Sequence, residues 1–155
     1  MKIRLTTAII AALVLPTAAS AQDAGAAPTF GEVSLSSGFT PDPYMVELRS
    51  GGSIDAARTL GGNCVGFVAS APDFDLYFNA GSLPLIISVA AAADTTLVIN
   101  GPDGEWYCDD DSGDGLNPSI RFAAPQTGLY DIWVGTYADN SLQEATLSIS
   151  ELVSQ

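Results

Sequence analysis

The fold is decided by residues 94–137, which read DTTLVINGPDGEWYCDDDSGDGLNPSIRFAAPQTGLYDIWVGTY. Short runs rich in β-branched and aromatic residues alternate here with turn residues. Residues 95–100 precede the turn at 101–104, residues 105–108 follow it, and two further runs come after an acidic loop at 109–115. Short alternating runs that end at regularly spaced turns are typical of antiparallel strands. The stretch therefore predicts consecutive strands and no helix.

The same pattern extends in both directions from this stretch. Residues 45–49, 64–69, 75–78 and 145–149 alternate as half-buried strands do, and residues 85–89 (LIISV) form an apolar run that suits a central strand. Residues 54–60 fit either a strand or a helical turn. The chain is therefore predicted to be all-β, an antiparallel, jelly-roll-like β-sandwich of about eight to nine strands.

The N-terminus carries the pattern of a secretory signal peptide. Lys2 and Arg4 precede an apolar segment at 5–15, and Ala19-Ser20-Ala21 is a small-residue cleavage site. The apolar segment is too short to span a bilayer, although a membrane-retained helix is the alternative. We expect residues 1–21 to be the signal peptide, 22–29 a flexible linker and 30–155 one domain. The protein is then exported, periplasmic or extracellular, without membrane insertion.

The chain is strongly acidic. It has 18 Asp and Glu residues against five Lys and Arg, and a net charge of −13. After residue 21 its basic residues are Arg49, Arg58 and Arg121. A surface so negative repels nucleic acid, and no basic patch offsets it. Nucleic acid is therefore not an expected partner.

Several catalytic chemistries lack their residues. The chain contains no histidine, so it has no imidazole base for a Ser-His-Asp or Cys-His site. Lys2 lies in the predicted signal peptide, which removes lysine-based mechanisms, and zinc sites usually need His or several Cys. Paired carboxylates remain available. We expect a protein that is not an enzyme, with a small secreted hydrolase using carboxylates as the alternative.

Cys64 and Cys108 are the two cysteines of the chain. In an oxidising compartment an even pair predicts a disulfide. Two free thiols or an intermolecular link are the alternatives.

The acidic loop is the candidate metal site. Read from Asp110, it has the spacing Asp-x-Ser-x-Asp-Gly, as in the first half of an EF-hand loop, but Arg121 stands where the bidentate glutamate belongs. It is therefore not an EF-hand, and the alternative is a solvated turn. The candidate calcium ligands are Asp109, Asp110, Asp111, Ser112 and Asp114.

Aromatic residues supply a second candidate site. Alternation places Tyr130, Ile132 and Val134 in the core, with Tyr130 at a sandwich corner. Trp133 and Tyr137 then face the other side, near Trp106. Exposed aromatics stack on sugar rings or on a protein partner, so these three residues are a candidate binding surface. The alternative is that additional N-terminal strands cover them.

From about residue 66 to residue 150 the chain resembles a bacterial pre-peptidase C-terminal domain. The segments that carry the resemblance are residues 75–81 (DLYFNAG), 85–89, 94–99, 101–104, 109–111 and 128–134. The resemblance implies a jelly-roll-like sandwich with an accessory role, and no activity, because no peptidase domain is present. Residues 30–60 depart from the family and are interpreted as additional strands. The expected function is a non-catalytic secreted module that binds an unknown protein or carbohydrate, and calcium.

Overall fold

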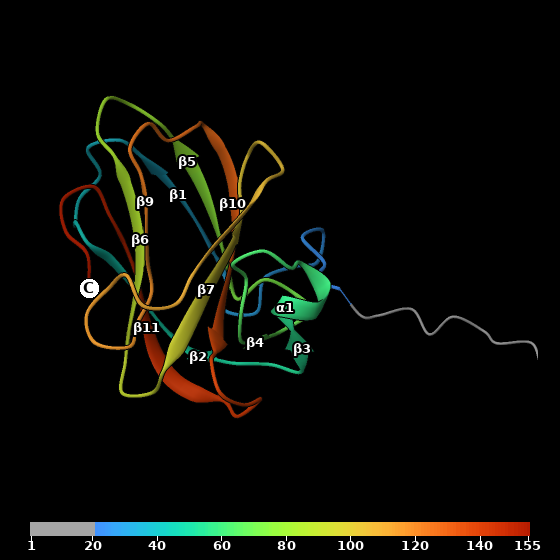
Figure 1. The fold of residues 1–155 in the computed structure, drawn as a ribbon. Coiled ribbons are helices and arrows are strands. Elements are labelled where there is room, and N and C mark those ends of the chain that lie inside the picture. Colours follow the sequence, from blue (N-terminus) through green and yellow to red (C-terminus); the bar gives the residue numbers. More distant parts are fainter. Residues whose placement is uncertain (1–20) are drawn as a thin grey trace, which may run out of the picture.

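A computed structural model describes residues 21–155, and they form two packed β-sheets (Figure 1). Most of the predicted signal peptide, residues 1–20, lies outside the described residues. The elements in chain order are β1 (Glu32–Ser36), β2 (Tyr44–Ser50), β3 (Ile54–Asp55), α1 (Ala56–Thr59), β4 (Phe67–Val68), β5 (Phe74–Asn79), β6 (Leu85–Ala91), β7 (Thr95–Asn100), β8 (Trp106–Asp109), β9 (Ser119–Phe122), β10 (Gly128–Thr136) and β11 (Gln143–Ser150).

The larger sheet is organised around β10. One edge of β10 pairs with β5 and, at Thr136, with β4, while its other edge pairs with β7. Strand β1 extends this sheet beyond β5, β8 extends it beyond β7, and β3 pairs with β4. The smaller sheet has the order β2-β11-β6-β9 and is antiparallel throughout.

The prediction of an all-β, two-layer fold is confirmed, with two corrections. The described residues form 11 strands rather than eight to nine, and two of them, β3 and β4, have only two residues each. The larger sheet is mixed, because β1 runs parallel to β5. Residues 54–60, which fitted a strand or a helical turn, contain both: β3 followed by α1.

The hairpin β7–β8 takes its register from its turn. The Gly104 amide donates to the Gly101 carbonyl (2.9 Å), and the Gly101 amide donates to the Glu105 carbonyl (2.9 Å). Gly104 has a φ of +78°, which glycine adopts without strain, so the turn closes with a one-residue bulge. This turn places Asn100 opposite Trp106.

The domain has two apolar cores, one on each face of the larger sheet. The main core lies between the sheets and includes Leu76, Leu97 and Ile132. Tyr130 is buried there and its hydroxyl donates to the Gln126 carbonyl (2.9 Å), as expected for a corner tyrosine. The second core lies on the outer face, under α1 and its flanking loops. Its buried residues are Ile54, Ala56, Cys64, Val68, Val98 and Trp133.

Residues 22–29, expected to be a flexible linker, are attached to the domain instead. The Asp23 amide donates to the Ser70 carbonyl (2.8 Å) and the Thr29 amide to the Pro72 carbonyl (2.9 Å). Ala24 packs against the second core. The small residues of this segment were interpreted as flexible, whereas these hydrogen bonds hold the segment beside residues 70–72, with every second residue exposed. No helix within residues 21–155 has the length and apolar character needed to cross a membrane.

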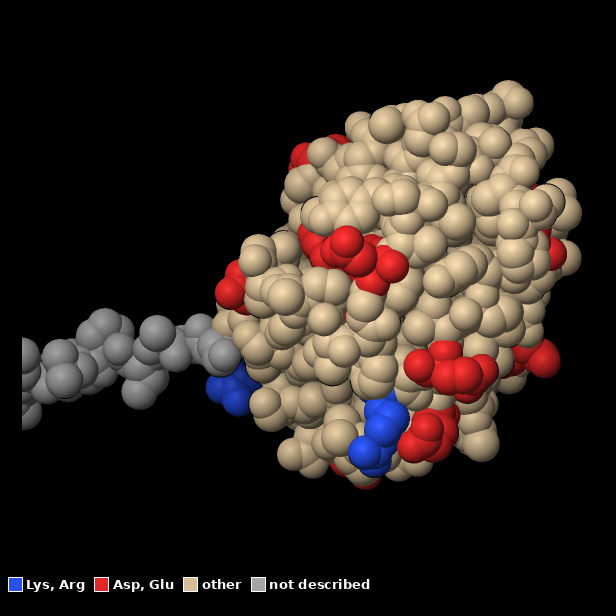
Figure 2. All heavy atoms as spheres, turned by 180° about the vertical axis from the view of Figure 1, so that it is seen from behind, with Lys and Arg blue, Asp and Glu red and all other residues tan. Residues whose placement is uncertain are grey.

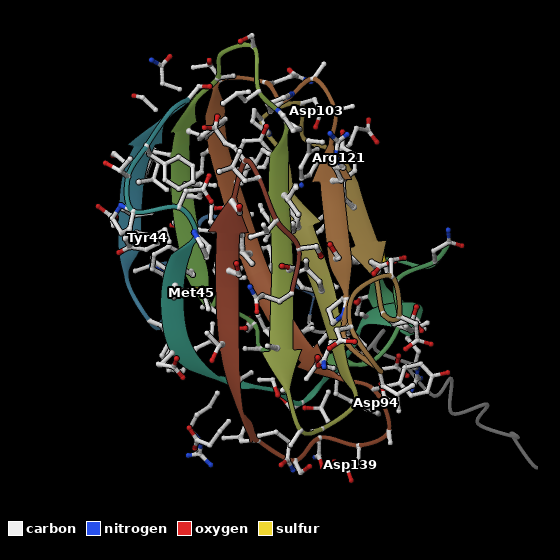
Figure 3. The ribbon with its side chains drawn as sticks, turned by 90° about the vertical axis from the view of Figure 1, so that its left-hand side faces the viewer. Tyr44, Met45, Asp94, Asp103, Arg121 and Asp139 are labelled. Atoms are coloured by element: carbon white, nitrogen blue, oxygen red, sulfur yellow. A yellow bond between two sulfur atoms is a disulfide. The ribbon has the colours of Figure 1, made fainter. Side chains whose placement is uncertain are left out.

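The C-terminal residues cover part of the outer face of the smaller sheet, which faces the viewer in Figure 3. The Gln155 amide donates to the Ser88 hydroxyl (3.0 Å), and the Val153 amide donates to the Ser150 hydroxyl (2.9 Å). These serines are buried on a sheet face that would otherwise be open to solvent. This part of the smaller sheet therefore does not offer an open binding surface.

Candidate functional site

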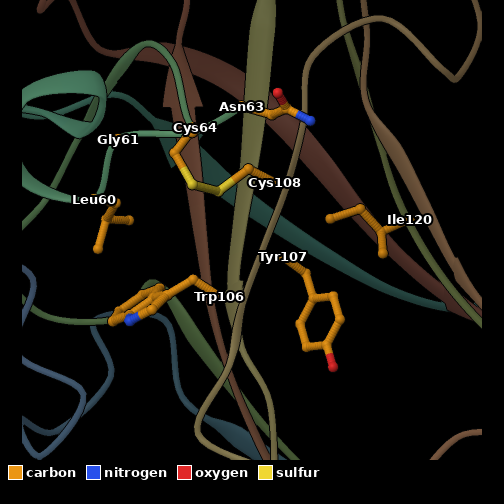
Figure 4. Close-up of a pocket in the computed structure, with 9 residues that line it drawn as sticks. Leu60, Gly61, Asn63, Cys64, Trp106, Tyr107, Cys108 and Ile120 are labelled. Carbon is orange, nitrogen blue, oxygen red and sulfur yellow. A yellow bond between two sulfur atoms is a disulfide. The ribbon is translucent and has the colours of Figure 1, made fainter.

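A hollow of about 390 Å³ lies along β8 (Figure 4). Among residues 21–155, strand β8 pairs with β7 alone and is therefore an edge strand. The disulfide and Trp106 lie on one side of the β8 ribbon, and Tyr107 and Ile120 lie on the other. The residues that line the hollow are Leu60, Gly61, Gly62, Asn63, Cys64, Trp106, Tyr107, Cys108 and Ile120.

The predicted disulfide between Cys64 and Cys108 is confirmed, and it builds one wall of the hollow. The two Cα atoms are 5.0 Å apart. The loop at residues 60–63 leads from the end of α1 to Cys64, so the bond fixes this loop beside β8. Helix α1 begins directly after Asp55, which is its N-cap: the Asp55 carboxylate accepts the Ala57 amide (3.0 Å). The wall therefore follows from a helix cap at one end and a covalent bond at the other.

The three aromatic residues of the candidate binding surface do not form one exposed surface: Trp106 and Trp133 are in contact, but Trp133 is buried and Tyr137 lies apart from them. Trp133 has no exposed surface, so the expectation that it lies on the open face is wrong. Trp133 belongs to the second core, in which residues on and around α1 cover its ring. Tyr137 is 47% exposed, and its amide donates to the Asp94 carbonyl (3.0 Å) just before the start of β7. Trp106 lies opposite Asn100, at the other end of β7.

Trp106 is the one of the three that lines the hollow. It is partly exposed, and its ring packs on the buried ring of Trp133 with centroids 5.3 Å apart and planes 44° apart. The buried Trp133 ring contacts the Trp106 ring on its protein-facing side and so limits the movement of Trp106. An aromatic side chain held in this way offers contact area at a low cost in conformational entropy.

Tyr107 is held on the inner side of β8 by a polar network. Its hydroxyl donates to Asp103 Oδ2 (2.6 Å), and Gln126 Nε2 donates to the same oxygen (3.1 Å). The hydrogen bond to the Asp103 carboxylate raises the pKa of Tyr107 to about 12, and the same bond lowers the pKa of Asp103. The tyrosine therefore stays protonated and fixed at neutral pH.

The acidic loop continues directly from β8, and Asp109 organises it. Asp109 Oδ2 accepts the amides of Ser112 (3.0 Å) and Ser119 (2.8 Å), and Oδ1 accepts the Ser112 hydroxyl (2.6 Å). Asp111, Ser112 and Asp114 are exposed, and Asp110 is partly exposed. Between residues 21 and 155 there is no group of three or more His, Cys, Asp or Glu arranged to hold a metal ion. Calcium binding at this loop stays a prediction.

Two neighbouring strands bring a pair of buried carboxyl groups together away from the hollow. Asp75 on β5 lies opposite Asp131 on β10, and one oxygen of each is buried without a hydrogen-bond partner. Burial raises the pKa of Asp75 to about 6, with a further contribution from the Asp131 carboxylate, and burial also raises the pKa of Asp131. Sequence reasoning missed this pair because the register between β5 and β10 decides it.

A third buried acid, Asp73, completes the hydrogen bonding of β10. Strand β5 leaves β10 after Ile132, and β4 joins it only at Thr136. In the gap between them the Val134 amide donates to Asp73 Oδ2 (2.7 Å). Burial raises the pKa of Asp73 to about 7, against the opposing effect of this hydrogen bond. Asp73 thus satisfies a backbone donor that the sheet leaves unpaired.

Sequence reasoning also missed the loop wall of the hollow, Tyr107 and Ile120. A signal was available, because a bond between Cys64 and Cys108 places the chain neighbours of one cysteine beside those of the other. Residues 61–63 then line the same hollow as Trp106 and Tyr107, and Figure 4 shows Asn63 near Cys108 and Leu60 near Trp106. Ile120 had no such signal, since the packing of β9 beside β8 brings it there.

Comparison with known proteins adds little to this geometry. No family model matches the sequence, and none of the curated proteins is similar to it. The resemblance to pre-peptidase C-terminal domains therefore stays a prediction. Among solved structures, PliG from Aeromonas hydrophila, a periplasmic lysozyme inhibitor of g-type lysozyme, has 10% sequence identity and a TM-score of 0.43, with 77% of this chain and 96% of that chain covered. A likeness at this level carries no argument about function.

Proposed function

We propose that this chain is an exported, non-catalytic binding module whose ligand, a protein or a carbohydrate, contacts Trp106 in the hollow along β8. The observation that carries the proposal is the construction of this hollow. A partly exposed tryptophan lies on a buried one, and on the same side of β8 a disulfide fixes the loop that forms one wall. The disulfide also fits a protein that folds outside the cytosol.

The walls of the hollow are held in place before any ligand arrives. Trp106 is supported by Trp133, Tyr107 is bonded to Asp103, and residues 61–63 are tied to Cys64. Binding to a rigid site loses less conformational entropy than binding to a mobile one. The hollow combines aromatic and aliphatic side chains with polar groups of the loop and strand that line it, and a preformed concave site with both kinds of group fits a ligand site.

The residues of the hollow support binding without catalysis. None of the nine residues that line it is a histidine, lysine, aspartate or glutamate. The acids with raised pKa values are Asp73, Asp75, Asp94 and Asp131, and none of them lines the hollow. Asp75 and Asp131 lie side by side within one sheet, rather than across a cleft as a glycosidase would need.

Two further parts of the proposal concern the accessory role and calcium. The resemblance to pre-peptidase C-terminal domains agrees with a module that serves a larger assembly. Calcium bound by the carboxylates of Asp110, Asp111 and Asp114 would stiffen the loop that leaves β8. Neither part is required for ligand contact at Trp106.

Paired glycan and peptide arrays test the proposal, with the mature protein compared to Trp106→Ala and Tyr137→Ala variants. We expect ligands that bind the wild type to lose most of their signal with Trp106→Ala and to keep it with Tyr137→Ala. Tyr137 is the matched control because it is an exposed aromatic at the other end of β10. Circular dichroism establishes that both variants are folded. Ligands that bind Trp106→Ala as well as the wild type would overturn the proposed site.

A further inference from the structure

We infer that the ligand of this hollow is an extended polypeptide segment that adds as a strand to the free edge of β8, with an apolar centre and basic flanking residues. The inference rests on the proposed function and deepens it, since it chooses a protein partner over a carbohydrate. It follows from three features of β8: its unpaired backbone, the walls on both sides of it, and the charges at its two ends.

The backbone of β8 has polar groups free on the edge that faces the hollow. In an antiparallel ladder, residues whose N–H and C=O point to the partner strand alternate with residues whose groups point away. The bond from the Gly101 amide to Glu105 fixes this alternation. Tyr107 then bonds to Ile99 of β7, while the backbone groups of Trp106 and Cys108 point outward. Unpaired edge groups are a template for a strand from another chain.

The walls of the hollow suit the side chains of an added strand. Successive side chains of a strand point to opposite faces of the sheet. In Figure 4, Trp106 and the disulfide lie on one side of β8, and Tyr107 and Ile120 lie on the other. A segment paired with β8 would therefore place alternate side chains against apolar groups on both faces. β8 has four residues, so the paired segment would extend over about 13 Å.

Negative charge at both ends of β8 favours basic residues on the flanks of the segment. Asp103 and Glu105 precede the strand, and Asp109, Asp110 and Asp111 end or follow it. No arginine lines the hollow between them. Figure 2 shows one face of the molecule, on which acidic side chains lie in scattered groups and basic ones are sparse. Complementary charge steers association and opposes acidic partners.

A carbohydrate would use only part of this site. A sugar ring stacks on an open aromatic face, but Trp106 is only partly exposed and lies beside the loop at 60–63. Stacking would also leave the outward N–H and C=O groups of Trp106 and Cys108 without partners from the ligand. The backbone of an added peptide strand would bond to these groups, and its side chains would fill both sides of the hollow.

The test uses the mature protein and a synthetic hexapeptide, Arg-Thr-Val-Val-Thr-Arg with blocked ends, in calorimetric titration. Two further peptides carry N-methyl groups on one or the other alternate set of amides. Because only one edge of the peptide faces β8, we expect one methylated peptide to bind about tenfold more weakly and the other to bind like the parent. Trp106→Ala should abolish binding, and glutamate in place of both arginines should weaken it.

Equal binding by all three peptides would exclude strand addition, and no binding by the parent peptide at millimolar concentration would overturn the inference. A chitin trisaccharide is titrated in parallel. Its binding to the wild type but not to Trp106→Ala, without peptide binding, would leave the proposed function standing and refute the polypeptide ligand. The two proposals can therefore fail separately.

Discussion

Replacing Asp73 by asparagine should stabilise the protein at pH 8 relative to the wild type, and much less at pH 4. Asp73 is buried, and its carboxylate accepts the Val134 amide. Asparagine keeps an acceptor oxygen at this place and removes the negative charge. The perturbation thus separates the charge of Asp73 from its hydrogen bond.

The magnitude follows from the pKa of Asp73, which burial raises from 3.8 to about 7. The native state holds a proton that the unfolded state releases, so the free energy of unfolding falls as pH rises between these two values. One pKa unit corresponds to about 1.4 kcal/mol, and Asp73 therefore costs the wild type about 4 kcal/mol above pH 7. Below pH 4 the carboxyl is mostly protonated in both states and this cost is small.

The assay is urea unfolding of both proteins between pH 4 and pH 8, followed by the fluorescence of the two tryptophans, Trp106 and Trp133. Asp75, with a pKa of about 6, also weakens both proteins as pH rises, so the informative quantity is the difference between the two profiles. We expect that difference to grow by about 4 kcal/mol between pH 4 and pH 8. Any cost of burying the asparagine amide is independent of pH, so it changes the difference in unfolding free energy by the same amount at every pH.

Parallel profiles for the wild type and Asp73→Asn would refute the reasoning, because they would mean that Asp73 is ionised in the native state at neutral pH. Asp73→Ala serves as the control for the hydrogen bond. It leaves the Val134 amide buried without an acceptor, which costs about 1–3 kcal/mol. We expect this cost at every pH, so Asp73→Ala should be less stable than Asp73→Asn throughout the range.

Three other perturbations have outcomes that the structure fixes. Serine in place of both Cys64 and Cys108, which are 44 residues apart, should lower the free energy of unfolding by about 4 kcal/mol in urea titration, and an unchanged midpoint would contradict a stabilising bridge. Trp133→Ala should cost about 3–5 kcal/mol and Trp106→Ala clearly less, because only Trp133 is fully buried; equal costs would contradict the second core. Millimolar calcium should raise the melting temperature of the wild type and not that of an Asp110→Ala, Asp114→Ala double variant, and a wild-type melt unaffected by calcium would remove the metal proposal.

Local pattern was sufficient to predict the β-class of the chain, the bridge between Cys64 and Cys108 and the burial of Tyr130. Each depends on neighbours in sequence or on composition. Turn residues end the strands, an isolated pair of cysteines in an oxidising compartment forms a bond, and alternation assigns each side chain to a face. Alternation also placed Trp133 correctly on the face opposite Tyr130.

What lies on each face was decided by the tertiary structure. Trp133 is buried because the segment around α1 folds over the outer face of the larger sheet, and no periodicity within β10 reports this cover. Asp75 and Asp131 meet, and β1 runs parallel to β5, through the pairing of strands far apart in the chain. The hollow along β8 likewise needs a loop, an edge strand and a residue of the other sheet at one place. Sequence fixes which side of a strand a residue faces, whereas contacts between distant segments fix whether that side meets protein or solvent.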